Sequence, residues 1–428
     1  MYRQAFALPA GLCLFMAMAW PQAASSALTP DQLVEAAIAR NRDFLSLKQR
    51  IVEARGLLKQ SRVGPVDTVE FNGLAGQPFG NAAEDSFSLS YSHTFETFGK
   101  RGKRVAAAEQ AVAVAQAEFD DRRRALSLEV KSRYADAVAE QQKLAVLDRL
   151  LPVNREYLRL TEARVQKGDA APLEADLLRV ELNRDTARRA LTEGRVRDAI
   201  LQLKASLDIP STDPISFSFS FKPPTVAFDL PHLKSLALSK RPDLITLQIA
   251  GEQAAKQTKL AEVETKPNLT LSGQYSHVDT AFNQFGLTQA GALTPIRDHV
   301  DSVGLGISIP LSSARRNRGN IEASIARQSG VRLRRGYLES AIPTQVEAAY
   351  QRWRAAQSAA DVFTKDVIDQ SEKNLAVMRQ AYNLGELRLL DILNEQRRLL
   401  DTELSYIDAQ AELFRSYAEL ENAAGGSL

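Results

Sequence analysis

Side chains able to do chemistry are few and scattered along this 428-residue chain. None of the four histidines is paired at metal-ligand spacing, and no His-Glu-x-x-His motif or cysteine cluster occurs. His299, between Asp298 and Asp301, is expected to be a solvated loop residue. Gly99-Lys100 lacks the other residues of a phosphate-binding loop, and no serine elbow or dinucleotide fingerprint is present. We therefore expect no catalytic residues, no cofactor and no metal site.

Two basic clusters each open a long helical stretch, where the helix dipole disfavours cations. Because they recur at matching places in the chain, we interpret them as contacts with anionic head groups or phosphates at the inner face of a membrane. A solvated turn is the alternative interpretation. The clusters consist of Lys100, Arg101 and Arg104, and of Arg315, Arg316 and Arg318.

The chain is an internal duplication with a constant spacing of about two hundred residues. The segment 41–45 matches 241–245, and Leu33 and Ala37 fall on Leu233 and Ala237 without a gap. Each half has the pattern helix, strand, strand, long helix, tight turn, helix. We expect a signal peptide at 1–27, a first repeat at 28–208, a connector at 209–231 and a second repeat at 232–424.

The start of the chain resembles a secretory leader. Arg3 provides the positive charge, the apolar run 12–19 is too short to span a bilayer, and Ala27 ends a plausible cleavage site. The only cysteine, Cys13, lies in this leader, so the mature chain has no disulfides. A net charge of +2 argues against nucleic acid as a partner.

Four segments alternate between apolar and small polar residues. In the first repeat Phe87, Leu89 and Tyr91 alternate with serines, and His93 interrupts the same apolar face, where we expect it near a membrane interface. In a soluble sandwich the apolar face would lie in a core; in an outer-membrane barrel it faces lipid and the Ser/Gly face lines a wet lumen. The expected strands, each about ten residues as a tilted crossing requires, are about 67–79, 86–97, 267–278 and 301–312.

The remaining sequence predicts long helices rich in Ala, Glu, Gln, Arg and Leu. A helix of the expected length is roughly 100 Å long and needs partner helices along its whole extent. Pro152 and Pro343 predict kinks or breaks. Residues 75–85 and 279–299 are expected to be outer loops, and the connector an extended segment with a short strand that girdles the tunnel. The helices are expected at about 100–166, 170–207, 315–384 and 386–423.

Four strands are too few to close a barrel, and an open sheet in lipid leaves unsatisfied edges. Three copies provide twelve strands, an even number typical of bacterial barrels. The expected fold is a mixed α/β membrane protein. The strand count argues for an oligomer without fixing the number of subunits at three. The family resemblance given next implies that each subunit contributes four strands to a trimeric 12-stranded outer-membrane β-barrel, continuous with a long periplasmic α-helical barrel.

The sequence resembles the TolC family of outer-membrane efflux proteins over nearly the whole mature chain, and within it the CzcC-like heavy-metal branch. The resemblance implies a homotrimer in outer-membrane lipid, with a periplasmic helical tunnel in a Gram-negative cell. It also implies docking to a periplasmic membrane-fusion (adaptor) protein and an inner-membrane RND-type pump. The residues that carry it are Arg241-Pro242-Asp243-Leu244 and the segments 95–101, 303–311 and 316–320.

The resemblance also implies an iris-like gate at the helical tips. Counted from the turn glycines, Tyr382, Asp391 and Glu174 fall at gate positions, whereas Arg388 is adjacent to one and Asn394 replaces a constriction acid. Three Asp391 carboxylates near a symmetry axis would repel each other and favour cations. Alternatively, Asp391 and Glu174 are acids in the first turn of a helix, where the helix dipole favours them.

These observations predict a passive export duct of a tripartite efflux system, with heavy-metal cations as the expected cargo. A TolC-type duct for drugs or for type I protein secretion is the alternative within the same class. A soluble periplasmic coiled-coil adaptor or scaffold is the alternative from a different class.

Overall fold

The computed structural model describes residues 27–75, 84–221, 228–311, 317–363, 365–384 and 386–428. The expected signal peptide lies outside these ranges except for its last residue. Arg315 and Arg316 of the second basic cluster also lie outside them, as do parts of the expected loop at 75–85 and of the connector.

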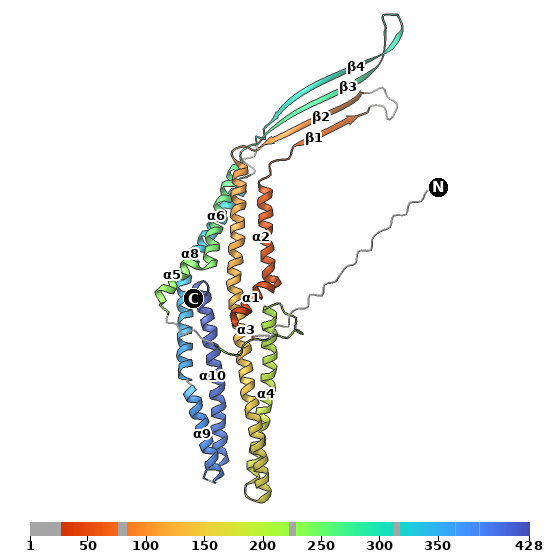
Figure 1. The fold of residues 1–428 in the computed structure, drawn as a ribbon. Helices are drawn as coiled ribbons and strands as arrows, with labels where there is room; N and C mark the ends of the chain where they lie inside the picture. The colour runs from red at the N-terminus through yellow and green to blue at the C-terminus, as the bar shows by residue number, and fades with distance from the viewer. Residues whose placement is uncertain (1–26, 76–83, 222–227, 312–316, 364, 385) are drawn as a thin grey trace, which may run out of the picture.

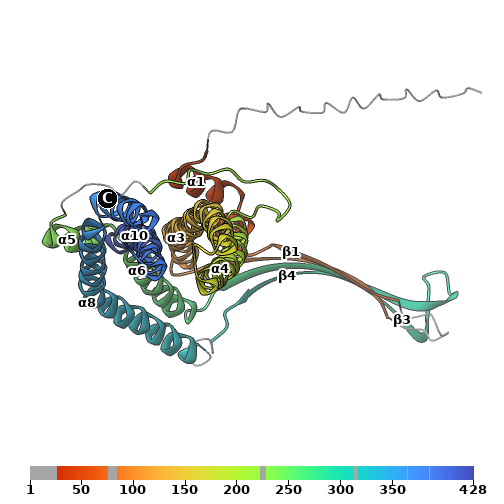
Figure 2. The ribbon, with the colours of Figure 1, turned by 90° about the horizontal axis from the view of Figure 1, so that it is seen from below.

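The chain is elongated, with a four-stranded sheet at one end and paired helices at the other (Figure 1). Figure 2, which looks along the helices, shows the sheet projecting to one side of them. The first repeat comprises α1 (Pro30–Arg40), α2 (Arg42–Ser61), β1 (Thr68–Leu74), β2 (Glu84–Phe95), α3 (Lys100–Lys167) and α4 (Pro172–Ser206). The second comprises α5 (Leu230–Lys240), α6 (Pro242–Glu264), β3 (Leu269–Leu287), β4 (Leu293–Ser308), α8 (Arg318–Val362), α9 (Lys365–Asn383) and α10 (Leu389–Ala424).

The second helix of each repeat begins at the same aligned position, although different residues start it. Asn41 caps α2 by accepting a hydrogen bond from the amide of Phe44, and Pro242 begins α6 at the position where a missing N–H costs nothing. The aligned pairs Leu33 and Leu233, Ala37 and Ala237, and Phe44 and Leu244 are all buried.

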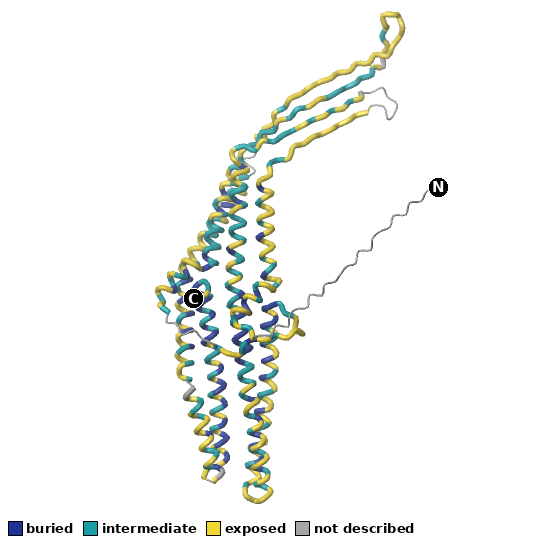
Figure 3. The backbone as a smooth tube through the Cα atoms, viewed as in Figure 1, coloured by how far each residue is buried: buried dark blue, intermediate teal, exposed yellow. Residues whose placement is uncertain are grey.

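The strands form one antiparallel sheet in the order β1-β2-β3-β4. Residues directly opposite each other share a face, so the register joins Val69 to Tyr91, Leu89 to Tyr275, and Gly273 to Leu305 on one apolar face. That face is open: Phe71 is 70% and Leu305 87% exposed. Figure 3 shows none of the described residues of the sheet as buried. Serines such as Ser88, Ser276 and Ser302 occupy the other face.

The strands of the second repeat are longer than predicted. The stretch 279–299 was expected to be a loop, but β3 continues to Leu287 and β4 starts at Leu293. The register shifts between Ala281 and Phe285. This bulge breaks the apolar/polar alternation, which is why the sequence pattern ends before the strand does.

The long helices meet at a core halfway along the molecule. Tyr134 of α3 is fully buried and packs against Phe217 of the connector and Phe414 of α10. Its hydroxyl donates to the carbonyl oxygens of Ser218 and Ser220, at 2.8 and 3.0 Å. The connector is thereby fixed across the helices, with an isolated parallel bridge between Leu28 and Phe217. No helix within the described ranges has the length and apolar character needed to cross a membrane.

The prediction of one helix over about 315–384 is wrong at Phe363, where the backbone leaves the helical region and separates α8 from α9. Both Pro152 and Pro343 lie inside continuous helices instead. The buried positions of α8 follow a heptad pattern that includes Val346 and Trp353. Continued without a break, that pattern would bury Val377, which is exposed in α9. The break therefore changes the phase of the buried stripe, and composition alone gives no sign of it.

Candidate gate at the helical tips

Each repeat ends in a tight helical turn at the far end from the sheet. In the first, Gly168 adopts a left-handed backbone conformation, with φ of 79°, that closes α3. The amide of Asp169 donates to the carbonyl of Arg164 at 2.9 Å. In the second, the amide of Glu386 donates to the carbonyl of Ala381 at 2.9 Å, a bond of the same span. The neighbouring Gly385 lies outside the described residues.

One contact joins the two turns. The hydroxyl of Tyr382 in α9 donates to Oε2 of Glu174 in α4, at 2.8 Å. The guanidinium carbon of Arg164 lies 5.3 Å from the centre of the Tyr382 ring, a cation–π distance. Burial, followed by the hydrogen bond and the charge of Glu174, raises the pKa of Tyr382, so the phenol remains protonated and donates. Two expected gate residues are thus brought together, with Arg164 as a third member that the sequence analysis did not identify.

The other three expected gate residues lie on exposed positions at the start of α10. Arg388 precedes the helix, and its amide donates to Oδ2 of Asp391 at 3.3 Å. Asp391 therefore caps the first turn of α10, as the alternative interpretation of this acid expected. Asn394 is exposed one turn further along. In one subunit the structure does not bring these three residues to the contact between Tyr382 and Glu174.

A buried polar cluster lies further from the tip. Asn154 of α3 donates through its side-chain amide to Asp185 of α4 at 2.8 Å, and accepts from the side-chain amide of Gln396 in α10. Asp185 is only 4% exposed. Burial, and then the charge of Glu181, raise the pKa of Asp185. Three helices from both repeats are therefore joined by one small network.

Two ion pairs flank this cluster. Arg397 of α10 bonds both carboxylate oxygens of Glu181, and Arg149 of α3 donates to Glu403 of α10 at 2.6 Å. The hydrogen bonds from Arg397 hold the pKa of Glu181 below its usual value, whereas burial raises the pKa of Glu403. The interface therefore favours the ionised form of Glu181 and the protonated form of Glu403.

A signal for these residues was present in the sequence. The buried residues of α10 recur at spacings of three and four and include Leu389, Leu393 and Leu400. Gln396 and Glu403 fall in this otherwise apolar stripe. A polar residue at such a position requires a buried partner, so the pattern predicts contacts without saying which residues provide them.

The first basic cluster is used mainly within the junction between sheet and helices. Lys100 is 8% exposed, and its Nζ donates to the Lys266 carbonyl at 2.6 Å and to Asn268 at 2.7 Å. Arg104 donates to Glu96 and to two backbone carbonyls. Arg101, by contrast, is mostly exposed beside Glu96, and Arg318 is exposed at the start of α8. Arg101 and Arg318 are therefore the described cluster members with surface to offer a membrane.

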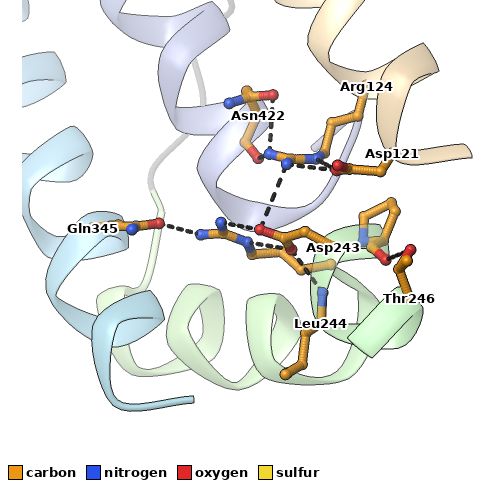
Figure 4. A network of polar contacts seen from close by, with 9 residues as sticks. Asp121, Arg124, Asp243, Leu244, Thr246, Gln345 and Asn422 are labelled. Carbon is orange, nitrogen blue, oxygen red and sulfur yellow. Dashed lines mark hydrogen bonds and ion pairs between the residues drawn. The ribbon is translucent and has the colours of Figure 1, made fainter. Parts of the chain in front are cut away.

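A second polar network fixes the repeats to each other at mid-height (Figure 4). Arg241 bonds both oxygens of Asp243 and donates to Gln345 at 2.7 Å. Arg124 lies 3.7 Å from Asp243 and donates to the carbonyl of Asn422 at 2.7 Å. The Arg-Pro-Asp-Leu motif is thus a structural junction of α3, α6, α8 and α10.

The duplicated strand pairs, the open apolar sheet and the joined helical tips define the architecture of an outer-membrane channel subunit. Comparison with known proteins agrees. Residues 33–208 and 233–426 match the family described as Outer membrane efflux protein. The chain therefore belongs to the outer membrane efflux protein family.

Several relatives have curated names. The outer membrane efflux protein BepC of Brucella suis is 23% identical over 337 residues, which cover 77% of this chain and 70% of BepC. The cobalt-zinc-cadmium resistance protein CzcC of Cupriavidus metallidurans is 19% identical over 414 residues, which cover 96% of this chain and 93% of CzcC. A crystal structure of CusC has the same fold, with a TM-score of 0.72, 17% identity, and coverage of 93% of this chain and 92% of CusC.

Proposed function

We propose that three copies of this chain form a passive export duct through the outer membrane, which opens at the helical tips to an adaptor and an RND-type pump. The observation that carries the proposal is the open apolar face of the sheet on top of long helical hairpins. Such a face is stable in water only if something covers it, and lipid around a closed barrel does so while satisfying the strand edges.

The helices support closure by further copies. The main helix contacts in the lower half run in the order α4, α3, α10, α9, so above the tip contact between Tyr382 and Glu174 the helices α4 and α9 are the two edges of the layer. Each edge carries an exposed stripe at heptad spacing, which is typical of a helix that lacks its partner. The stripe on α4 consists of Leu173, Leu177, Val180, Ala187 and Leu191; that on α9 includes Val367 and Val377, and the exposed Leu384 follows directly after the helix.

We assign the gate to the contact between Tyr382 and Glu174. It joins the last turns of the two hairpins, so separating the hairpins at the tip must break it. The exposed Asp391 and Asn394 would then face the opening, where three carboxylates favour cations.

The cargo that we favour is heavy-metal cations. CzcC matches almost end to end, with 93% of its length covered, whereas the solvent efflux protein SrpC of Pseudomonas putida is covered over 84% and BepC over 70%. Solvent export is the alternative that these relatives leave, because SrpC is 22% identical over 92% of this chain.

The test is complementation in a Gram-negative strain that lacks its own metal-efflux channel but retains the adaptor and the pump. The chain is expected to restore growth on zinc, cobalt and cadmium and to leave tolerance of toluene unchanged. Restored tolerance of toluene alone would contradict the metal assignment. Fractionation of the chain with soluble periplasmic proteins would contradict the channel itself and favour a scaffold.

A further inference from the structure

The apolar face of the sheet carries two matching groups of polar side chains. In the first, Tyr91 donates to Asp67 at 2.9 Å, and Nδ1 of His93 lies 2.5 Å from the same carboxylate. We call this group the inner triad.

In the second group, which we call the outer triad, Tyr275 donates to Asp301 at 2.7 Å, and Nδ1 of His277 lies 2.8 Å from it. Each triad is a Tyr-x-His sequence on one strand with an aspartate from the neighbouring segment: Asp67 directly precedes β1, and Asp301 lies in β4.

The register places the triads at opposite corners of the apolar face. His93 is opposite Leu271 on β3, whereas His277, six residues further along β3, is opposite Phe87. The inner triad spans β1 and β2 at the end next to the helices, and the outer triad spans β3 and β4 towards the far end. Six residues correspond to about 20 Å along a strand.

The inclination of the strands increases this separation along the helix direction. In Figure 1 the helices run up the page, and the strands rise obliquely with β1 lowest and β4 highest. At the 35–45° tilt of membrane strands, the 20 Å contribute about 15 Å of height. The three strand spacings from Asp67 to Asp301, about 4.8 Å each, contribute about 9 Å more. The two carboxylates thus lie about 25 Å apart in height, the extent of the apolar band of outer-membrane barrels.

Between the triads the outward face is apolar. It presents Val69, Phe71, Leu89, Val303 and Leu305, all exposed in one subunit. Beyond the outer triad, the next row of the same face is charged or polar and consists of Asp85, Asp279 and His299. The polarity of the surface therefore changes at the outer triad.

We infer that the two triads bind the head-group layers on either side of the membrane and thereby set the depth of the barrel. This inference rests on the proposed function, because it requires the sheet to lie in lipid. Tyrosine is suited to such a boundary, since its ring is apolar and its hydroxyl needs a polar partner. In both triads the tyrosine is the member nearer the middle of the band, and the Asp–His pair is the outer one.

Tryptophan fluorescence provides the test. The chain has two tryptophans: Trp20, in the predicted leader, and Trp353, which is buried in the helices. The mature protein with Trp353→Phe is therefore expected to contain no tryptophan, so that any tryptophan fluorescence comes from an introduced reporter. Single reporters are then placed at Leu89→Trp in mid-band and at Phe87→Trp next to the outer triad. The full-length trimer is reconstituted in phosphatidylcholine vesicles whose chains are brominated either near the head group or near the chain end.

Leu89→Trp is expected to be quenched more strongly by the deep bromines and Phe87→Trp by the shallow ones. Replacing the outer pair with leucine, as His277→Leu with Asp301→Leu, extends the apolar band outwards. Deep bromines should then become the stronger quencher of Phe87→Trp. The matched control is Ser276→Leu with Ser302→Leu, an adjacent pair on the opposite face, which should leave the quenching pattern unchanged.

The outcomes separate the two proposals. An unchanged pattern for Phe87→Trp in the leucine variant, with Leu89→Trp still quenched, would overturn the inference and leave the channel intact. No quenching of Leu89→Trp in either lipid would overturn the channel itself. If the leucine variant does not insert, Asp301→Asn tests the same point, with a smaller shift expected in the same direction and the absence of any shift counting against the inference.

Discussion

Arg397 of α10 and Glu181 of α4 form a two-point ion pair, with Nε 2.9 Å from Oε1 and Nη2 2.5 Å from Oε2, although they are 216 positions apart in the chain. The pair holds the last helix of the second repeat against the hairpin of the first. Glu181 is buried and Arg397 is partly exposed. The pair therefore lies at the edge of the interface that the proposed opening of the tip would separate.

Replacing Arg397 with alanine is expected to weaken this interface by about 2 kcal/mol, because it leaves a buried carboxylate without its partner. Single-channel conductance in planar bilayers should show longer open times. The control is Arg398→Ala, the adjacent and largely exposed arginine, which should have no such effect. Equal open times in the two variants would show that the ion pair does not restrain opening.

The same pair predicts a dependence on acid. The pKa of Glu181 is lowered by Arg397 from an ordinary value of 4.5. Its stabilising contribution is therefore complete above that value and is lost as the pH falls below it. The wild-type channel should open more readily on acidification through this range, and Arg397→Ala should lose most of this response.

Asp185 is expected to act in the opposite direction. Because burial raises its pKa, the protonated form stabilises the interface at low pH and this contribution is lost as the pH rises. Asp185→Asn, which keeps the shape without the charge, should stabilise the closed hairpins at neutral pH by up to about 1 kcal/mol. Slower hydrogen exchange of the α4 amides in Asp185→Asn than in the wild type would show this stabilisation. Asp198→Asn, at an exposed position of the same helix, should leave exchange unchanged.

Tyr382→Phe removes the hydrogen bond to Glu174 but keeps the ring against Arg164. A loss of about 1 kcal/mol from the closed state corresponds to an increase of roughly fivefold in the open population. Conductance measures this increase directly. Tyr337→Phe, on an exposed part of α8, provides the control. Unchanged open probability in Tyr382→Phe would remove the contact from the gate.

The sequence predicted much of the architecture because the repeats carry their signals locally. Asn41 and the Pro242 motif mark helix starts. The alternation of Phe87, Leu89 and Tyr91 with serines marks a strand, and this pattern can be recognised from neighbouring residues alone. By contrast, the bulge after Ala281 and the break at Phe363 depend on packing against distant elements, so neither is visible in a local pattern.

The candidate site was less predictable for the same reason. Tyr382 and Glu174 were found through resemblance, since no local pattern joins positions 208 residues apart. Lys100 was expected to face a membrane, but its ammonium group donates hydrogen bonds to the Lys266 carbonyl and to Asn268, which come from the other repeat. Partners supplied by the second repeat determine the role of each of these residues.

The mid-height network predicts a difference between aligned residues of the two repeats. Burial opposes ionisation of Asp243, but its bonds with Arg241 and the charge of Arg124 outweigh this and lower its pKa. The resulting stability is present above its ordinary value of 3.8 and is lost as the pH falls. Asp243→Asn should therefore lower stability in detergent at neutral pH by about 2 kcal/mol. Thermal unfolding measures the loss, and Asp43→Asn, at the aligned but exposed position, should have little effect.

The exposed heptad stripes of α4 and α9 predict where one subunit meets the next. Leu191 on α4 is 67% and Val377 on α9 is 64% exposed, and a charge at either position would be desolvated in a helix–helix seam. Leu191→Glu and Val377→Glu are therefore each expected to reduce the trimeric fraction in detergent, measured by light scattering. Ala190→Glu adds the same charge one residue away, about 100° around the helix, and should leave the trimer intact.

Because α4 and α9 lie on opposite edges of the layer, a head-to-tail ring predicts a further effect. In a ring that mixes the two glutamate variants, one seam carries both substitutions and another carries neither, so the doubly substituted seam should still prevent closure and trimers should not be restored. Restoration by mixing the two glutamate variants would contradict a ring built from these two edges.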